Sequence, residues 1–175
     1  MQELTEILEA ATAGIEPMYF RLNIDGGDPV NRERVYCYEL YHQMRRRWPN
    51  ASEFYLNGEI DKAAHPILRR LGAANRKPDL LIHRPGYMSG NYAIVEVKHC
   101  RTSPQGIAKD LRTLTLFRST VGYERAIYLV YGNQCEITAD RIANVAARMG
   151  GTTPIELWLH RGVGEPATRV ATIVA

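Results

Sequence analysis

Residues 77–98 decide the fold and divide into three parts: Lys77-Pro-Asp-Leu-Leu-Ile-His83, Arg84-Pro-Gly-Tyr-Met-Ser-Gly-Asn91 and Tyr92-Ala-Ile-Val-Glu-Val-Lys98. The first and third parts are rich in β-branched and apolar residues, a composition typical of β-strands. The middle part contains proline, glycine and asparagine, which favour turns. The stretch therefore predicts a β-hairpin.

The register of this hairpin predicts a cluster of charged side chains. In a symmetric hairpin the numbers of paired residues sum to 175, which places Asp79 opposite Glu96. Side chains alternate between the two faces of a strand, so Tyr92, Ile94, Glu96 and Lys98 share one face. Directly opposed residues have Cβ atoms about 4.5–5.5 Å apart. The two carboxylates should therefore converge, with Lys98 beside them.

Two opposed carboxylates destabilise a sheet unless something compensates their charge. A divalent cation would do so, and Mg²⁺ typically takes one or two protein carboxylates together with water and substrate phosphate. Such a site suits phosphodiester hydrolysis, with Lys98 orienting the attacking water or neutralising charge on the phosphate. The alternative interpretation is a turn aspartate beside a half-exposed Glu96–Lys98 surface pair.

The segment Lys77-Pro-Asp79 … Ile94-Val-Glu-Val-Lys98 resembles the active-site motif of the PD-(D/E)xK nuclease superfamily, also called restriction-endonuclease-like. The resemblance implies an α/β fold with a central mixed β-sheet flanked by helices. Its core, over about residues 30–132, would be a helix, a three-strand meander, a crossover helix and a further strand. The resemblance also implies a Mg²⁺-dependent endodeoxyribonuclease, with Mn²⁺ as a substitute. Asp79 and Glu96 would hold the metal and Lys98 would assist the water.

The first core helix of that superfamily often supplies an additional acid to the metal site. Here a long helix is predicted from Pro29 or Asn31 to about residue 48, and Glu39 lies on it near Tyr38 and His42. A carboxylate on a partly apolar face is costly to bury unpaired. Glu39 is therefore the first candidate for an accessory metal ligand and catalytic acid. A surface glutamate bonded to Gln43 is the alternative.

Other polar residues are candidates for supporting roles. Glu59 and Asp61 follow a predicted strand at residues 53–57 and are alternative accessory ligands. A helix predicted from about residue 104 to Phe117 would be the crossover helix. Superfamily members often use this helix to support the site, and the residues that could do so here are Gln105, Lys109 and Asp110. An ordinary salt bridge between helix and sheet is the favoured alternative for each of these.

Charge is distributed unevenly along the chain. The formal net charge is +3, yet residues 62–118 hold 11 Lys or Arg and only 3 acids, two of which are Asp79 and Glu96. A basic segment around a few acids is typical of a phosphate-binding cleft, so nucleic acid, with DNA expected, is the predicted partner. The proposed contact residues are Arg76, Lys77, Arg101, Lys109 and Arg112. A non-catalytic nucleic-acid-binding or assembly module with the same fold is the alternative function.

Four tyrosines near these segments are candidates for stacking on nucleic-acid bases: Tyr36, Tyr38, Tyr41 and Tyr87. Aromatic side chains serve this purpose in single-strand binders. Tyrosines on helix faces are more often packing residues, and packing is the favoured interpretation here.

Bulk properties predict one domain over residues 1–175, with residues from about 133 forming a C-terminal strand and helix extension. Hydrophobic residues make up 45% and charged residues 23%, as in ordinary globular proteins.

No apolar run is long enough for a membrane span and no secretory signal is present, so no membrane association is expected. Three scattered cysteines predict reduced thiols and a cytoplasmic, intracellular location. Many related nucleases act as dimers, which makes a homodimer a candidate assembly.

The remaining pattern predicts helices over residues 4–13, 67–72 and 138–148, and strands over 125–131, 154–160 and 168–174, with the last strand a candidate for the sheet edge. Residues 18–24 are predicted to form a strand or an extended arm.

Overall fold

The computed structural model describes residues 3–59 and 66–174. In chain order the helices are α1 (Glu3–Ala13), α2 (Pro17–Phe20), α3 (Glu33–Arg46), α4 (Pro66–Arg70), α5 (Pro104–Leu116) and α6 (Cys135–Met149). The strands are β1 (Leu22–Ile24), β2 (Gly27–Val30), β3 (Tyr55–Gly58), β4 (Leu80–His83), β5 (Asn91–His99), β6 (Arg125–Tyr131), β7 (Ile155–His160) and β8 (Thr168–Ile173). A short 3₁₀ turn, Met88–Gly90, precedes β5, and a π-helical turn, Phe117–Val121, follows α5.

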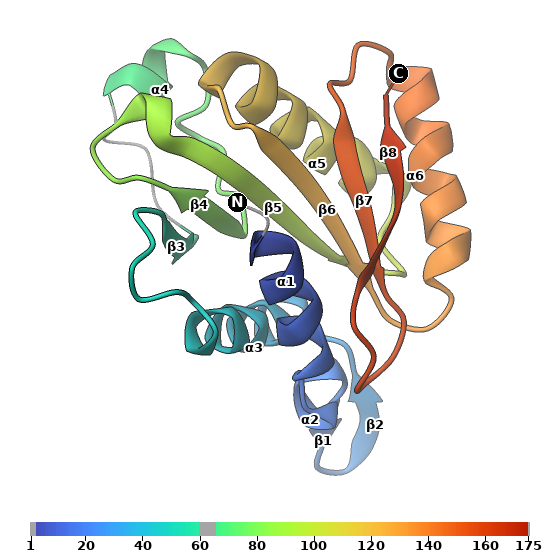
Figure 1. Cartoon of the computed structure of the whole chain (residues 1–175). Coiled ribbons are helices and arrows are strands. Elements are labelled where there is room, and N and C mark those ends of the chain that lie inside the picture. Colours follow the sequence, from blue (N-terminus) through green and yellow to red (C-terminus); the bar gives the residue numbers. More distant parts are fainter. Residues whose placement is uncertain (1–2, 60–65, 175) are drawn as a thin grey trace.

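A six-stranded mixed sheet forms the centre of the molecule, with strand order β3-β4-β5-β6-β7-β8 (Figure 1). The first three strands form an antiparallel meander. Strands β5, β6 and β7 are parallel, and β8 returns antiparallel to β7 at the sheet edge, as predicted. The fold is therefore α/β with a mixed sheet flanked by helices, and strands β1 and β2 form a separate hairpin.

The predicted hairpin register is confirmed between β4 and β5. Leu80 pairs with Val95, and Ile82 pairs with Ala93. The register then shifts, because His83 pairs with Asn91 and leaves Tyr92 as an extra residue. Such a bulge turns its side chain away from the regular alternation. Tyr92 consequently packs with the cluster of Val95 and Val97 and not with Ile94, which corrects its predicted face.

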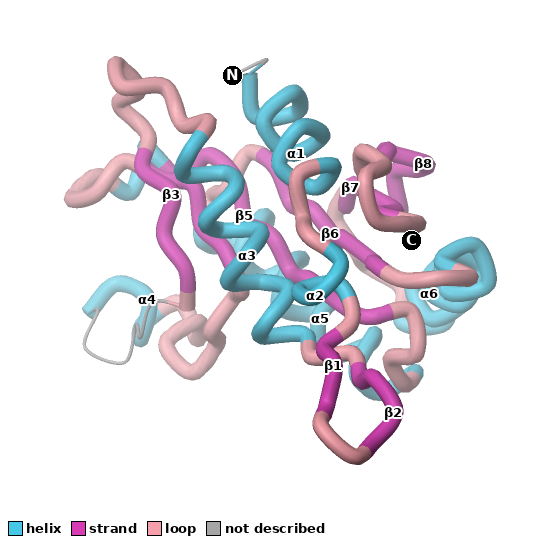
Figure 2. Tube along the Cα trace, turned by 90° about the horizontal axis from the view of Figure 1, so that it is seen from below, coloured by secondary structure: helices cyan, strands magenta, loops and turns pink. Residues whose placement is uncertain are grey.

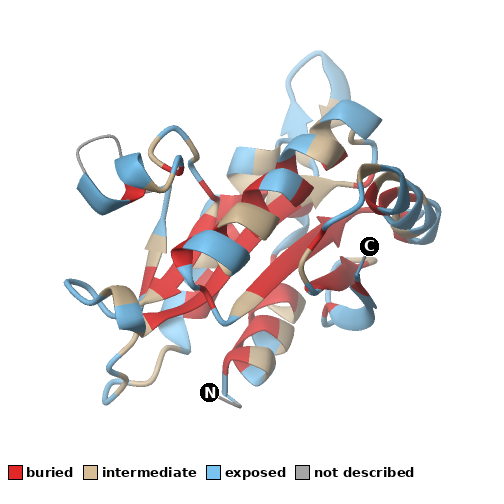
Figure 3. Cartoon of the chain, turned by 90° about the horizontal axis from the view of Figure 1, so that it is seen from above, coloured by how far each residue is buried: buried red, intermediate tan, exposed pale blue. Residues whose placement is uncertain are grey.

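Two apolar layers cover the two faces of the sheet. On one face, helices α1 and α3 contribute Leu4, Leu8, Tyr36 and Leu40 to a cluster that includes residues of β3 to β7. On the other face, helices α5 and α6 pack their apolar stripes against alternate residues of β4 to β7. Helix α3 lies over β3 and β5 (Figure 2). Strands β4 to β7 are mostly buried, whereas the outer faces of the helices are exposed (Figure 3).

Helix α1 is bound to the part of the sheet that comes last in the chain. The backbone N–H of Ala167 donates to Thr12 Oγ1 at 2.8 Å, in a buried hydrogen bond. The guanidinium of Arg125, on β6, contacts Thr5 Oγ1 at 3.3 Å and forms an ion pair with Glu156 on β7. The first helix thus depends on strands more than 100 residues away in sequence.

Several predicted elements have different bounds in the structure. The strand or extended arm predicted for residues 18–24 is a strand only over Leu22–Ile24. A short helix precedes it, because Pro17 opens a turn and Phe20 packs edge-on against Tyr36 and Tyr131. Helix α3 begins at Glu33, after an extended Arg32, and not at residue 29 or 31.

Of the helices in the described ranges, none has the length and apolar character needed to cross a membrane. The three cysteines are free and buried.

Candidate active site

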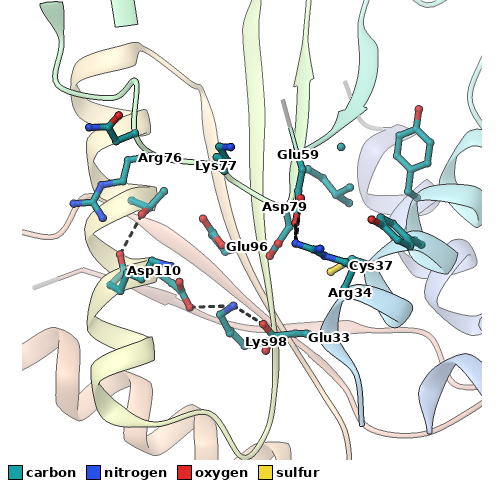
Figure 4. A pocket seen from close by; sticks show the side chains of 17 residues that line it. Glu33, Arg34, Cys37, Glu59, Arg76, Lys77, Asp79, Glu96, Lys98 and Asp110 are labelled. Atoms are coloured by element: carbon teal, nitrogen blue, oxygen red, sulfur yellow. Dashed lines mark hydrogen bonds and ion pairs between the residues drawn. The ribbon is translucent and has the colours of Figure 1, made fainter. Parts of the chain in front are cut away.

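A cavity of about 670 Å³ opens beside the β4–β5 hairpin (Figure 4). One wall consists of a stripe along α3 together with the end of β3. The opposite wall consists of the segment that precedes β4 and one side of α5. Asp79, Glu96 and Lys98 lie between them. The described lining residues that carry charge are Glu33, Arg34, Glu59, Arg76, Lys77, Asp79, Glu96, Lys98, Lys109 and Asp110.

The predicted pair of acids meets in this cavity. Asp79 Oδ2 accepts a hydrogen bond of 2.7 Å from the backbone N–H of Val97, which fixes its carboxylate against β5. The carboxyl groups of Asp79 and Glu96 lie within hydrogen-bonding reach of each other. Burial, and then the charge of Asp79, raises the pKa of Glu96 well above its usual range. Burial also raises the pKa of Asp79. The two carboxylates are thus brought together at an electrostatic cost.

Lys98 lies between two further acids. Its Nζ is 2.6 Å from Glu33 Oε1 on α3 and 3.9 Å from Asp110 Oδ2 on α5. Burial alone would lower the pKa of Lys98, but the carboxylates of Asp110 and Glu33 outweigh it and raise the pKa. Lys98 is therefore held as a cation. Sequence and structure agree on Asp79, Glu96 and Lys98 as neighbours.

Glu39 does not line the cavity, although it was the first candidate for the accessory acid. Its Oε1 accepts a hydrogen bond of 2.6 Å from Gln43 Nε2, the partner that the alternative interpretation named. Gln43 lies next to Gly14, which follows α1, so this pair occupies the face of α3 toward α1. The acid that α3 does supply to the cavity is Glu33.

Glu33 was not among the predicted site residues because the sequence pattern does not show which stripe of the helix faces the cavity. Glu33, Cys37 and Tyr41 fall on one stripe at helical spacing and line the cavity. Glu33 Oε2 also accepts a weak hydrogen bond of 3.3 Å from the backbone N–H of His99. An acid in the first turn of a helix is favoured by the helix dipole, and that position was the available signal.

The other candidate acids have distinct positions. Glu59 lines the cavity and forms an exposed ion pair of 3.2 Å with Arg34. Asp61 lies outside the described residues. Asp110 is buried, accepts a hydrogen bond of 3.1 Å from Tyr128 Oη, and has its pKa raised by burial to about 6. The crossover helix therefore contributes Asp110 to the cavity.

The five candidate contact residues for nucleic acid separate into two groups. Arg76, Lys77 and Lys109 line the cavity beside the acids. Arg101 instead lines a depression just after the end of β5. Arg112 lines another depression, between α5 and α6. The structure thus brings together three of the five predicted cations and the acids.

The donor atoms suit a hard divalent cation. Asp79 and Glu96 offer carboxylate oxygens in a buried site, and the charge of Lys98 lowers the pKa of both without offsetting the effect of burial. No group of three or more His, Cys, Asp or Glu side chains within residues 3–59 and 66–174 has the arrangement of a metal site. Two carboxylates completed by water and phosphate oxygens are sufficient for Mg²⁺.

Comparison of the chain with protein-family models, with curated proteins and with solved structures finds no match. The cavity must therefore be interpreted from its own chemistry.

Proposed function

We propose that this protein is a metal-dependent nuclease that hydrolyses phosphodiester bonds of nucleic acid, with DNA as the expected substrate. The observation that carries the proposal is the convergence of Asp79, Glu96 and Lys98 in one cavity with a basic rim. Buried carboxylates with raised pKa values are expected where a protein is built to bind a cation. The rim residues Arg76, Lys77 and Lys109 supply the positive charge that a phosphate backbone requires.

The order of elements around the cavity supports the same proposal. Helix α3, the meander β3-β4-β5, helix α5 and the parallel strand β6 follow one another along the chain. This is the order that the resemblance to the PD-(D/E)xK superfamily implies for its core. The acids also lie on the second and third strands of the meander or directly before them, where that motif requires them.

Asp79 and Glu96 would hold Mg²⁺ or Mn²⁺, and Glu33 would act through its ion pair with Lys98, since no group of three acids forms a metal site among the described residues. A bound metal would supply an activated water and stabilise negative charge on the phosphate. The side chains themselves position the reactants, because the backbone N–H of Val97 fixes Asp79 and β5 fixes Glu96.

Lys98 acts as a charge stabiliser in this proposal. Glu33 and Asp110 keep it protonated, so it is a poor general base but a good hydrogen-bond donor to phosphate oxygen. A fixed ammonium group aimed at developing negative charge lowers the barrier in a site shielded from water. Of the two roles expected for Lys98, the contacts favour neutralisation of the phosphate.

Cleavage of supercoiled plasmid and of single-stranded DNA, each with Mg²⁺, Mn²⁺ or EDTA, tests the proposal. We expect metal-dependent cutting by the wild type and a loss of about 100-fold or more in Lys98→Ala and in Asp79→Asn. Arg112→Ala is the matched control for the loss of a cation outside the cavity, and it should retain cutting within a few fold. Circular dichroism would verify that all variants fold.

Equal cutting by the wild type and by Lys98→Ala would contradict the assignment of the site. Salt-sensitive retention of DNA without any cutting would favour the alternative, a non-catalytic nucleic-acid-binding or assembly module with this fold.

A further inference from the structure

We propose that the substrate of this cavity is an unpaired strand, whose base stacks on Tyr38 while its phosphates follow the basic wall opposite. This inference rests on the proposed function, since it names the strand type that the same site accepts. Its basis is the position of one tyrosine relative to the acids and cations of the cavity.

The structure separates the four candidate tyrosines. Tyr36 is 0% exposed and stacks on Tyr131 with ring centroids 3.8 Å apart, so it is a core residue. Tyr41 is half-buried, and its hydroxyl approaches the carbonyl oxygen of Leu56. Tyr87 is 61% exposed in the hairpin loop, with the Arg84 guanidinium 4.9 Å from its ring centroid. Only Tyr38, among these four, is both largely exposed, at 62%, and part of the cavity lining.

The exposed ring of Tyr38 lines the cavity and is open to contact with a ligand bound there. The nucleobase is a fitting partner, because stacking of a base on an aromatic ring contributes about 1–3 kcal/mol and tolerates any sequence. Tyr38 and Tyr41 lie about one turn apart on the α3 wall and offer the apolar surface of the cavity.

The opposite wall has a different character. Arg76 and Lys77 lie in the segment before β4, and Lys109 lies on α5. Figure 4 shows Arg76 and Lys77 on the side of the acids away from Cys37 and Arg34 of α3. The acids thus lie between the α3 wall, which offers two tyrosines beside the Arg34–Glu59 ion pair, and a wall that carries three cations and Asp110. A single strand of nucleic acid placed between these walls would turn its phosphate backbone to the wall with the cations and its bases to the wall with the tyrosines.

A duplex cannot use both walls, because its bases are paired and stacked inside the helix. Glu96 is also recessed, at 6% exposed, so the scissile phosphate must enter the cavity to approach it. Sites of this depth act on single strands or on nucleotides drawn out of the stack. The cavity volume of about 670 Å³ is in the range of sites for small ligands, which suits one or two nucleotides.

The test compares a fluorescent single-stranded 15-nucleotide DNA with the matching blunt duplex. Binding is measured by anisotropy in EDTA and cutting is measured in Mg²⁺, for the wild type, Tyr38→Ala, Tyr38→Trp and Tyr87→Ala. We expect the single strand to bind more tightly than the duplex, and Tyr38→Ala to weaken single-strand binding about 5–150-fold. Tyr38→Trp should retain binding, since the ring and not the hydroxyl makes the contact. Tyr87→Ala matches Tyr38→Ala in residue type and exposure and should behave as the wild type.

Binding and cutting report separately on the two proposals. The inference is supported if the wild type prefers the single strand and, of the two alanine variants, only Tyr38→Ala loses this preference. That support holds even if no protein cuts DNA. The absence of cutting would count against the nuclease proposal and not against the inference. Equal use of duplex and single strand, or equal binding by Tyr38→Ala and Tyr87→Ala, overturns the inference and leaves the nuclease proposal to its own test. A loss of binding in Tyr38→Trp as large as in Tyr38→Ala also overturns it.

Discussion

Glu33 holds two groups of the candidate site in place. Its carboxylate accepts from Lys98 Nζ at 2.6 Å and from the backbone N–H of His99 at 3.3 Å. It thereby connects the first turn of α3 to the end of β5. Glu39, only six positions later in the chain, has no such contact and binds Gln43. The two glutamates therefore form a natural pair for comparison.

We expect Glu33→Gln to reduce metal-dependent cutting about 10-fold or more, because the amide cannot neutralise Lys98 or contribute a charged oxygen to the site. Glu39→Gln should leave cutting within about twofold of the wild type, since Glu39 does not line the cavity. The measurement is the initial rate of cleavage by the two folded variants at saturating Mg²⁺. The reverse order of effects would restore Glu39 as the accessory acid.

Glu96 should lower the stability of the metal-free protein. Burial and the charge of Asp79 raise the pKa of Glu96 in the folded state. At pH values between the ordinary glutamate pKa and this raised pKa, Glu96 is protonated in the folded protein and ionised in the unfolded chain. The folded protein therefore binds more protons in that range. The free energy of unfolding therefore falls as the pH rises through that range. Asp110, with its pKa raised to about 6, acts in the same direction between about pH 4 and 6.

We expect Glu96→Gln to raise the melting temperature in EDTA at pH 8 by about 2–4 °C, which corresponds to about 1 kcal/mol in a chain of this size. The difference from the wild type should shrink at pH 5. Differential scanning fluorimetry at the two pH values provides the measurement. A lower melting temperature for Glu96→Gln at pH 8 would show that the carboxylate is satisfied without a cation.

Addition of Mg²⁺ should reverse this order. A cation that binds only the folded state stabilises it by about 1.4 kcal/mol at ten times its dissociation constant. We expect a Mg²⁺-dependent rise in the melting temperature of the wild type and a much smaller rise for Glu96→Gln. Equal shifts for the two proteins would place the metal elsewhere.

The β4–β5 hairpin fixes the opposition of the two acids, and its loop is tightly built. The carbonyl oxygen of Gly90 accepts from the backbone N–H of Arg84 at 2.8 Å. A Cβ atom at Gly90 would clash with Cβ of Arg84. The loop therefore requires glycine at this position for space and not for an unusual backbone angle.

We expect Gly90→Ala to destabilise the protein by about 1–3 kcal/mol, as overpacking does, and to lower the melting temperature by several degrees. Gly27→Ala is the matched control, because a Cβ there would meet nothing closer than 3.8 Å. Thermal unfolding of the two variants provides the comparison. Equal stability of Gly90→Ala and the wild type would show that the loop can relax without cost.

Much of this architecture follows from local sequence. The hairpin register was predictable because one short loop joins two apolar strands, and symmetric pairing across that loop holds from Leu80 to Ile82. The bulge at Tyr92 was not, since it depends on how the turn Met88–Gly90 closes. The accessory acid was missed because local sequence does not fix the phase of α3, the rotation of the helix about its own axis relative to the sheet. Which acid faces the cavity depends on that phase and on the packing of α1.

Positive charge is concentrated on one wall of the cavity, and its effect should appear in the salt dependence of binding. For single strands, log K falls with log salt concentration by about 0.7 per neutralised phosphate. We expect the combined Arg76→Ala, Lys77→Ala and Lys109→Ala variant to flatten this slope by about two. The double variant Arg101→Ala and Arg112→Ala removes two cations outside the cavity and should leave the slope unchanged. Equal slopes for all three proteins would exclude the basic wall as the path of the backbone.

The hydrogen bond between Thr12 and Ala167 has a consequence for biosynthesis. The two residues are 155 positions apart, and at about 5–20 residues per second the ribosome needs about 8–30 s to add Ala167 after Thr12. During this interval α1 cannot complete its packing, although α3, the hairpin and α5 have already been made. We therefore expect the nascent chain to acquire its finished cavity last, and truncations near the C-terminus to disturb the geometry of a candidate site that is encoded far upstream.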